Sequence, residues 1–267
     1  MKFVVTGDTH GQVMSRLMSF DHEKYPINDT AVIILGDVGV NFYLNKTDKK
    51  NKKIINNSGY IIYCVRGNHE ERPENIKGME QWYDETIEGT VWREAAYPNI
   101  RYLMDGHAYL FNGHPTLVIG GAYSVDKWYR LSHMPKDAEW TGWFKDEQLT
   151  PEEMQDISAR FAGKHFHFIL SHTCPESWQP YDLFLPGLDQ STVDKSMEVW
   201  LEQFKETVTW NAWLFGHFHN DRLVRPGVEM FFKDIEDLDT IWERWTSGKE
   251  LDWWLVKDPN YYVEEEN

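Results

Sequence analysis

Short runs of β-branched and aromatic residues recur along the chain, and longer amphipathic or polar stretches separate them. This alternation is typical of α/β proteins, in which helices cover a sheet of strands. We expect strands at residues 2–6, 31–35, 60–65, 100–104, 108–111, 115–119, 165–170 and 211–215. One helix is expected from the capping-box sequence Thr150-Pro151-Glu152-Glu153 to Gly163, and another over residues 192–205.

Length and composition limit the class of protein. The chain has 267 residues, of which 41% are hydrophobic, so it can bury a core and is not disordered. No apolar run approaches the ~20 residues needed to span a membrane, and we expect no membrane partner. With 27 Lys and Arg against 43 Asp and Glu, the formal charge of −16 repels nucleic-acid backbones, so non-specific nucleic-acid binding is not expected.

The N-terminus and the cysteines indicate the compartment. Residues 1–6 read directly as a strand and lack the features of a secretory signal. The two cysteines, Cys64 and Cys174, are too few for a disulfide framework, and Cys174 is most simply a buried thiol. We therefore expect a cytoplasmic protein.

Five of the expected strands are each followed directly by residues that can bind a metal ion. The five segments are Gly7-Asp8-Thr9-His10-Gly11, Gly36-Asp37, Gly67-Asn68-His69-Glu70, Ser171-His172 and Gly216-His217-Phe218-His219. Because α/β folds gather binding groups at the carboxyl edge of the sheet, these side chains can converge. Asp and Asn are also ordinary turn formers, but turn chemistry does not require histidines at matched strand ends.

The ordered series D-x-H, GD, GNH, H and GHxH resembles the calcineurin-like metallophosphoesterase superfamily, and the resemblance spans residues 7–219. The forms GDTHG and RGNHE are most similar to the branch that holds the serine/threonine phosphoprotein phosphatases and related bacterial and phage enzymes. The resemblance implies a four-layer αββα sandwich of the α/β class, formed by a single domain over residues 1–267. It also implies hydrolysis of a phosphate ester by a hydroxide that bridges two metal ions.

The resemblance also assigns roles to the residues at the strand ends. One metal ion would be held by Asp8, His10 and His219, the other by Asn68, His172 and His217, and Asp37 would bridge the two. His69 would be the general acid at the leaving group, with a packed bystander as the alternative. Oxygen and imidazole ligands without thiolate suit divalent ions, manganese first, with iron, zinc, magnesium or nickel as alternatives.

The chain departs from the phosphoprotein phosphatases after Asp37. Those enzymes carry GDxVDRG, whereas residues 36–41 read GDVGVN, so the Asp that orients the catalytic His and the Arg that grips phosphate are both missing. This departure argues against a protein phosphatase. Glu70 is a candidate for orienting His69. The candidates for substrate binding are Arg66, Tyr123, Lys127 and Arg130.

The expected activity is that of a phosphomonoesterase acting on a small phosphorylated substrate or a nucleotide. A phosphodiesterase or nucleotide pyrophosphatase is the alternative enzyme, and a non-catalytic scaffold with the same fold is the alternative from another class. Residues 124–150, which are rich in Trp and Tyr, are expected to form an insertion that acts as a lid or rim over the metal ions.

The C-terminal part, residues 228–267, is expected to form one helix and a tail. Hydrophobic residues repeat there at helical spacing, so their stripe is expected to pack on the core or to form an oligomer seam. The stripe is Phe231, Ile235, Leu238, Trp242 and Trp245. Elsewhere, His165 and His167 are expected to be structural. The lysines within 46–53 are expected to form a solvated helix face, with recruitment of an anionic substrate as the alternative.

Overall fold

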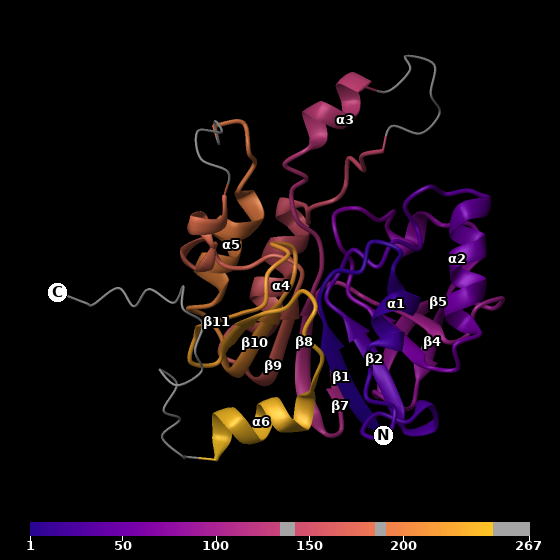
Figure 1. Ribbon diagram of the computed structural model, residues 1–267. Helices are drawn as coiled ribbons and strands as arrows, with labels where there is room; N and C mark the ends of the chain where they lie inside the picture. The colour runs from indigo at the N-terminus through magenta and orange to yellow at the C-terminus, as the bar shows by residue number, and fades with distance from the viewer. Residues whose placement is uncertain (134–141, 185–190, 248–267) are drawn as a thin grey trace.

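Two β-sheets lie face to face in the computed structural model, which describes residues 1–133, 142–184 and 191–247 (Figure 1). The first sheet has the strand order β13-β1-β2-β3-β6-β5-β4 and the second the order β11-β12-β10-β9-β8-β7. The first comprises β1 (Lys2–Thr6), β2 (Thr30–Ile34), β3 (Ile61–Cys64), β4 (Met79–Asp84), β5 (Gly89–Glu94), β6 (Ile100–Leu103) and β13 (Glu236–Asp237). The second comprises β7 (His107–Phe111), β8 (His114–Ile119), β9 (His165–Ser171), β10 (Thr209–Phe215), β11 (Arg222–Arg225) and β12 (Val228–Met230).

Helices cover the outer faces of both sheets. The helices are α1 (Val13–Met18), α2 (Lys46–Asn56), α3 (Lys127–His133), α4 (Pro151–Phe161), α5 (Ser196–Phe204) and α6 (Leu238–Thr246). Short 3₁₀ turns occupy Ile27–Asp29, Pro73–Asn75, Glu176–Trp178 and Tyr181–Leu183. Among the described residues, no helix is long and apolar enough to cross a membrane.

Three hydrophobic clusters hold the layers together. One lies between the sheets and joins residues such as Phe3 of β1 and Phe168 of β9. The second packs α4 and α5 on the second sheet, and the third packs α1 and α2 on the first. The order is therefore helices, sheet, sheet, helices, which confirms the four-layer α/β sandwich expected from the sequence.

Both sheets have parallel centres, and this places the strand ends that matter. The strands β1, β2, β3 and β6 run parallel in the first sheet, and β8, β9 and β10 run parallel in the second. The loops that follow β1, β2, β3, β9 and β10 meet across the two sheets, as the hydrogen bond from the His217 N–H to Asp8 Oδ1 shows (2.9 Å).

The two helices expected from sequence are present with adjusted ends. Thr150 caps α4 in a complete capping box with Glu153, and α5 begins at Ser196 rather than at residue 192. The C-terminal helix begins at Leu238, so the expected helix over residues 231–245 is wrong in its first part. Phe231 and Ile235 pack on the core from the loop that precedes β13, and Trp242 and Trp245 pack from α6 itself.

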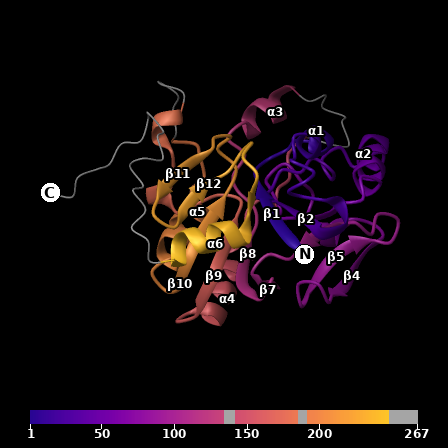
Figure 2. The ribbon, with the colours of Figure 1, turned by 60° about the horizontal axis from the view of Figure 1, so that its bottom comes forward.

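Helix α6 lies at the end of the sandwich opposite α3, where it packs on both β1 and β10 (Figure 2). His167 stacks on Trp242, with ring centroids 3.9 Å apart, and also hydrogen bonds with His114. The other expected structural histidine, His165, hydrogen bonds with Thr209 and Asn211. Of the lysines in α2, Lys52 is buried and pairs with Glu94, whereas the other four are exposed.

Candidate metal centre

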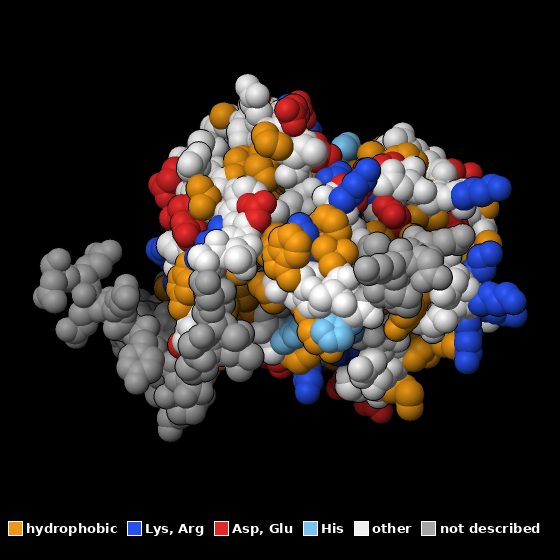
Figure 3. Space-filling view, turned by 90° about the horizontal axis from the view of Figure 1, so that it is seen from above, with side chains coloured by type: hydrophobic (Ala, Val, Ile, Leu, Met, Phe, Trp, Pro, Cys, Tyr) orange, Lys and Arg blue, Asp and Glu red, His pale blue; other side chains and the backbone are white. Residues whose placement is uncertain are grey.

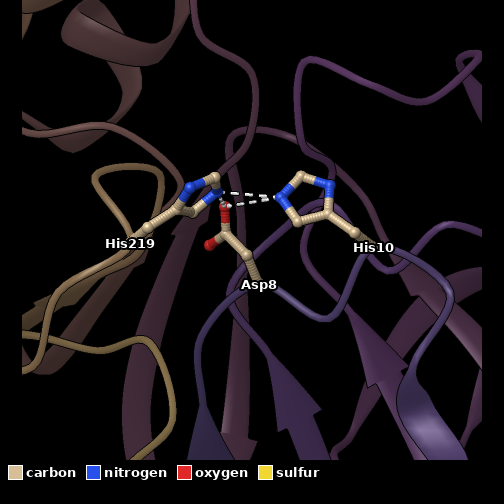
Figure 4. Close-up of side chains that lie close together, drawn as sticks. All are labelled: Asp8, His10 and His219. Carbon is tan, nitrogen blue, oxygen red and sulfur yellow. Dashed lines mark hydrogen bonds and ion pairs between the residues drawn. The ribbon is translucent and has the colours of Figure 1, made fainter.

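The first group of candidate ligands consists of Asp8 and His10, which follow β1, and His219, which follows β10 (Figure 4). His10 Nε2 lies 2.8 Å from His219 Nε2, and Asp8 Oδ2 lies 3.2 Å from His219 Nε2. Asp8 Oδ2 is buried and has no hydrogen-bond donor in good geometry within the described part of the chain. A buried carboxylate oxygen without a donor is costly, so the three atoms suit a cation held between them.

The second group brings Asn68, which follows β3, to His172, which follows β9. His172 Nδ1 lies 2.7 Å from the Leu35 carbonyl oxygen, which can only accept, so Nδ1 carries the proton. Burial lowers the pKa of His172, so its other ring nitrogen carries a lone pair. That nitrogen lies 2.9 Å from Asn68 Oδ1. A cation between these two acceptors would satisfy both, and the bond to Leu35 would orient the imidazole for it.

Asp37, which follows β2, lies between the two groups. Its Oδ2 is 3.7 Å from His172 Nε2 and 3.9 Å from His10 Nε2, while its Oδ1 accepts a hydrogen bond from the His69 N–H at 2.8 Å. Burial, and then the charge of Asp8, raise the pKa of Asp37 well above its usual range. Cations on either side would offset both effects, so this position fits a bridging carboxylate.

His217 reaches the same place but lies outside both groups. Its ring centroid is 5.0 Å from that of His172. Burial, and then the neighbouring His172, lower the pKa of His217 to about 3, so its imidazole is neutral and able to bind a cation. Six of the seven expected ligands therefore lie in direct contact in two linked groups, and His217 stands beside the second.

The backbone turns sharply at these positions. Outside glycine, the described residues with positive φ are His10, Asp37, Leu44, Glu88, Asn112, His217 and His219. Four of these seven are candidate ligands, with φ between 45° and 70°. Such a conformation costs about 1–3 kcal/mol per residue and persists only where the surroundings impose it. The strain therefore supports a functional role for these strand ends.

Two glycines allow the ligands to approach the backbone. A Cβ on Gly36 would lie 2.1 Å from His172 Nδ1, and a Cβ on Gly67 would lie 2.0 Å from Asp37 Oδ1. Neither contact can exist, so any larger residue would displace a ligand.

The substitution Gly67→Ala is therefore expected to weaken cation binding by about tenfold to a hundredfold, because forced overpacking costs about 1–3 kcal/mol. Titration of the metal-free protein with Mn²⁺ in a calorimeter measures this. Gly113→Ala is the control. A Cβ there meets nothing within 4 Å, and although alanine is strained at its φ of +77°, that strain lies in the turn between β7 and β8 and touches no candidate ligand. Equal cation affinity in the Gly67 variant and the wild type would contradict the close approach.

Glu70 holds the loops of the site together instead of orienting His69. Its carboxylate accepts hydrogen bonds from the Gly39 N–H (2.9 Å) and the Gly67 N–H (3.3 Å). It thereby ties the loop after β2 to the loop after β3. Burial, and then the charge of Asp37, raise the pKa of Glu70 to about 7. Among the described residues no recorded hydrogen bond joins Glu70 to His69, so the sequence-based suggestion that Glu70 orients His69 gains no support.

His69 lies beside the bridging position. Its Nε2 is 3.8 Å from Asp37 Oδ2, and its ring packs edge-on against Phe42. Burial, and then the positive charge of Arg130, lower the pKa of His69 to about 2. The imidazole is therefore neutral in the free site.

The four candidate substrate residues have different surroundings. Arg66 is 4% exposed, and its guanidinium donates to Asp105 Oδ2 and the Glu147 carbonyl oxygen, both at 2.7 Å. These contacts make Arg66 a structural residue and leave it little surface for a ligand. Tyr123 is also buried and donates to the Thr192 carbonyl oxygen at 3.2 Å.

Lys127 and Arg130 both belong to α3. Lys127 Nζ lies 4.0 Å from the centroid of the Trp143 ring, whereas Arg130 lies over Phe42, the residue that contacts His69. The charge of Arg130 acts on His10, Asp37 and His69. Of the four candidates, Arg130 is therefore the one whose charge acts on this cluster. Figure 3 shows histidine side chains at this end of the molecule, bordered by hydrophobic ones.

Sequence reasoning missed a polar residue that contacts a candidate ligand, and a second polar residue that contacts the first. Asn68 Nδ2 donates to Ser124 Oγ at 2.9 Å, and Ser124 in turn contacts Glu147. No local motif marks these residues, because the hydrogen bonds join positions 56 and 23 residues apart in the chain.

One comparison with known proteins identifies a family. A family model described as calcineurin-like phosphoesterase matches residues 1–221, a range that includes all seven candidate ligands. The comparison with curated proteins finds no match. Two solved structures resemble the chain at 12% identity, each over 90% of this chain and 95% of the other: the crystal structure of TT1561 of Thermus thermophilus, with a TM-score of 0.47, and a second crystal structure, with a TM-score of 0.46. By the extent of the family match, the chain belongs to the calcineurin-like phosphoesterase family.

Proposed function

We propose that this protein is a two-metal phosphomonoesterase. The observation that carries the proposal is that atoms with lone pairs and no proton face one another. Asp8 Oδ2 lies beside two imidazoles, and Asn68 Oδ1 lies opposite His172 Nε2. Two divalent cations held there would activate a water nucleophile and offset charge on the phosphoryl group. Oxygen and imidazole donors suit manganese, iron, zinc or magnesium.

The residues around the cluster support a monoester substrate. A phosphomonoester carries one more negative charge than a diester, and Arg130 supplies positive charge on the side of His69. Arg130 also donates to Asp126 Oδ2 (2.6 Å) and to the Gly142 carbonyl oxygen (2.9 Å), which hold the guanidinium over Phe42. The rim beyond it exposes Trp128 and Tyr129 of α3, so the ester's organic group can be apolar or aromatic.

His69 would assist the leaving group. Its neutral imidazole must gain a proton before it can act as a general acid, and the negative charge of a bound phosphate ester favours that gain. The charge of Arg130 opposes it, so the same guanidinium that binds phosphate limits protonation of His69 until the ester is in place.

A substrate panel with and without metal tests the proposed function. The protein is stripped with a chelator, reloaded with Mn²⁺ and offered p-nitrophenyl phosphate, its bis ester, nucleotides and a phosphopeptide. We expect metal-dependent hydrolysis, fastest with a monoester and absent after chelation. Faster cleavage of the bis ester would favour a phosphodiesterase. Failure to cleave any substrate would favour a non-catalytic scaffold.

A further inference from the structure

The amide group of Asn68 can face the second metal position with either of its two ends. Only the oxygen can bind a cation, because the NH₂ group has no lone pair to offer. In the structure Oδ1 faces His172 Nε2 and Nδ2 faces Ser124 Oγ, each at 2.9 Å. Asn68, Ser124 and Glu147 are all at most 3% exposed, so the surrounding protein rather than bulk water decides which end faces the cation.

The hydroxyl proton of Ser124 sets the direction of the hydrogen bonds. Ser124 Oγ lies 2.5 Å from Glu147 Oε2, and the Ser124 N–H donates to Glu147 Oε1 at 3.0 Å. A carboxylate accepts but does not donate, so the single hydroxyl proton points to Glu147. Ser124 Oγ is left with lone pairs toward Asn68 and can only accept from its NH₂ group. The oxygen of the Asn68 amide must then face His172.

The opposite side of the site is also fixed. His172 donates from Nδ1 to the Leu35 carbonyl oxygen and turns the lone pair of Nε2 toward Asn68. The backbone of Glu147 is anchored by Arg66, whose guanidinium donates to its carbonyl oxygen and also pairs with Asp105. The contacts from Arg66 to Asn68 are therefore continuous, and the hydrogen bonds from both ends converge on Glu147.

We propose that Glu147 and Ser124 are positioning residues that hold the Asn68 amide oxygen toward the second cation. Ser124 lies in the loop between β8 and α3, and Glu147 lies in the loop that precedes α4. This inference rests on the proposed two-metal function. It assigns a role to Arg66 as well, since Arg66 holds Glu147 where Ser124 can reach it.

The substitution Glu147→Gln tests the proposal without a change of volume. In this variant the Ser124 N–H still donates to the side-chain oxygen of the introduced glutamine. The NH₂ group of that glutamine then takes the place of Oε2 and donates to Ser124 Oγ. The hydroxyl proton must then turn to Asn68, which accepts only through its oxygen, and the Asn68 NH₂ group swings toward the cation. We expect the second Mn²⁺ to bind about tenfold to a hundredfold more weakly, the range measured for partners of metal ligands, and the first to be unaffected.

Removal of the Ser124 hydroxyl group should restore part of the affinity for the second Mn²⁺ that Glu147→Gln loses. Ser124→Ala frees the Asn68 amide without forcing it to turn, so we expect a loss of affinity near the lower, roughly tenfold, end of the range. The double variant should match Ser124→Ala, because Glu147 acts on Asn68 only through Ser124. A merely structural role for Glu147 would instead make the two losses add. Ser124→Ala alone also tests the proposal if Glu147→Gln does not fold.

Calorimetric titration of the metal-free proteins with Mn²⁺ gives the readout. It is run at mildly alkaline pH, because burial raises the pKa of Glu147 and the argument concerns its carboxylate form. Glu229→Gln is the matched control, because Glu229 is a buried carboxylate that bonds Arg244 and Trp245 and has no contact with Asn68 among those recorded in the structure. Two cations in the wild type with unchanged second affinity in Glu147→Gln, or additive losses in the double variant, would overturn this inference alone. Fewer than two cations in the wild type would overturn the proposed function with it.

Discussion

Replacing Asp37 with asparagine is expected to abolish metal-dependent turnover while leaving the metal-free protein at least as stable as the wild type. A carboxylate and a single positive charge 4 Å apart attract by about 4 kcal/mol in a protein environment, and divalent ions attract more strongly. The loss corresponds to at least roughly a thousandfold weaker cation binding. Without metal, the same substitution removes a buried carboxyl group whose pKa is raised by burial and by the charge of Asp8, so that its ionised form is unfavourable there.

Thermal unfolding with and without Mn²⁺ separates the two effects. Saturating metal at about a hundred times its dissociation constant stabilises a protein by about 2.7 kcal/mol, and Asp37→Asn should lose this response. The control is Asp84→Asn, because Asp84 is buried and paired with Tyr63 and Arg101. That variant should be less stable both with and without metal and keep the response. If Mn²⁺ stabilised Asp37→Asn as much as it stabilises the wild type, the result would contradict a bridging role for Asp37.

The sequence predicts the central strands and the site better than the periphery, for physical reasons. The strand β2 is buried along its whole length, on both faces, and therefore appears as a continuous apolar run. The hairpin of β4 and β5 was not predicted. In β4 only Asp84 is buried, so this edge strand has no apolar alternation to mark it.

The start of α6 shows how a distant contact overrides a local pattern. Phe231 and Ile235 continue the helical spacing of the stripe, yet the helix begins only at Leu238. The carboxylate of Asp221 accepts hydrogen bonds from the backbone N–H groups of residues 232, 233 and 234, at 2.7 to 3.0 Å, and holds a turn there. No spacing rule can reveal that contact, because it joins residues outside the repeat.

The candidate site also contains residues that the sequence predicts and residues that it misses. Its ligands were predicted because each follows a recognisable strand and because their order resembles a family pattern. Ser124 and Glu147 were not predicted, because their proposed role depends on the direction of one hydroxyl proton in the folded site. The departure after Asp37 is visible in the sequence. The sequence offers three cations in place of the missing Arg, and only the structure singles out Arg130, which α3 places beside Phe42.

The substitution His69→Ala is expected to slow hydrolysis of an alkyl phosphate by about 10²- to 10⁴-fold, the usual contribution of a general acid. Cation binding should remain, because the hydrogen bond from residue 69 to Asp37 runs through the backbone N–H, which alanine keeps. Hydrolysis of p-nitrophenyl phosphate should fall much less. Its leaving group departs as a stable anion and has little need of a proton.

Parallel kinetics on the two esters, together with a Mn²⁺ titration, distinguish proton donation from a structural role. His165→Ala is the control, since His165 is exposed on the second sheet and hydrogen bonds only with Thr209 and Asn211 among the described residues. An equal loss on both esters would mean that His69 only shapes the site. A loss confined to the alkyl ester would mean that His69 donates a proton to the leaving group. Burial and the charge of Arg130 keep His69 neutral in the free site, so it would gain that proton when the negatively charged ester binds. Acid catalysis would then be coupled to phosphate binding.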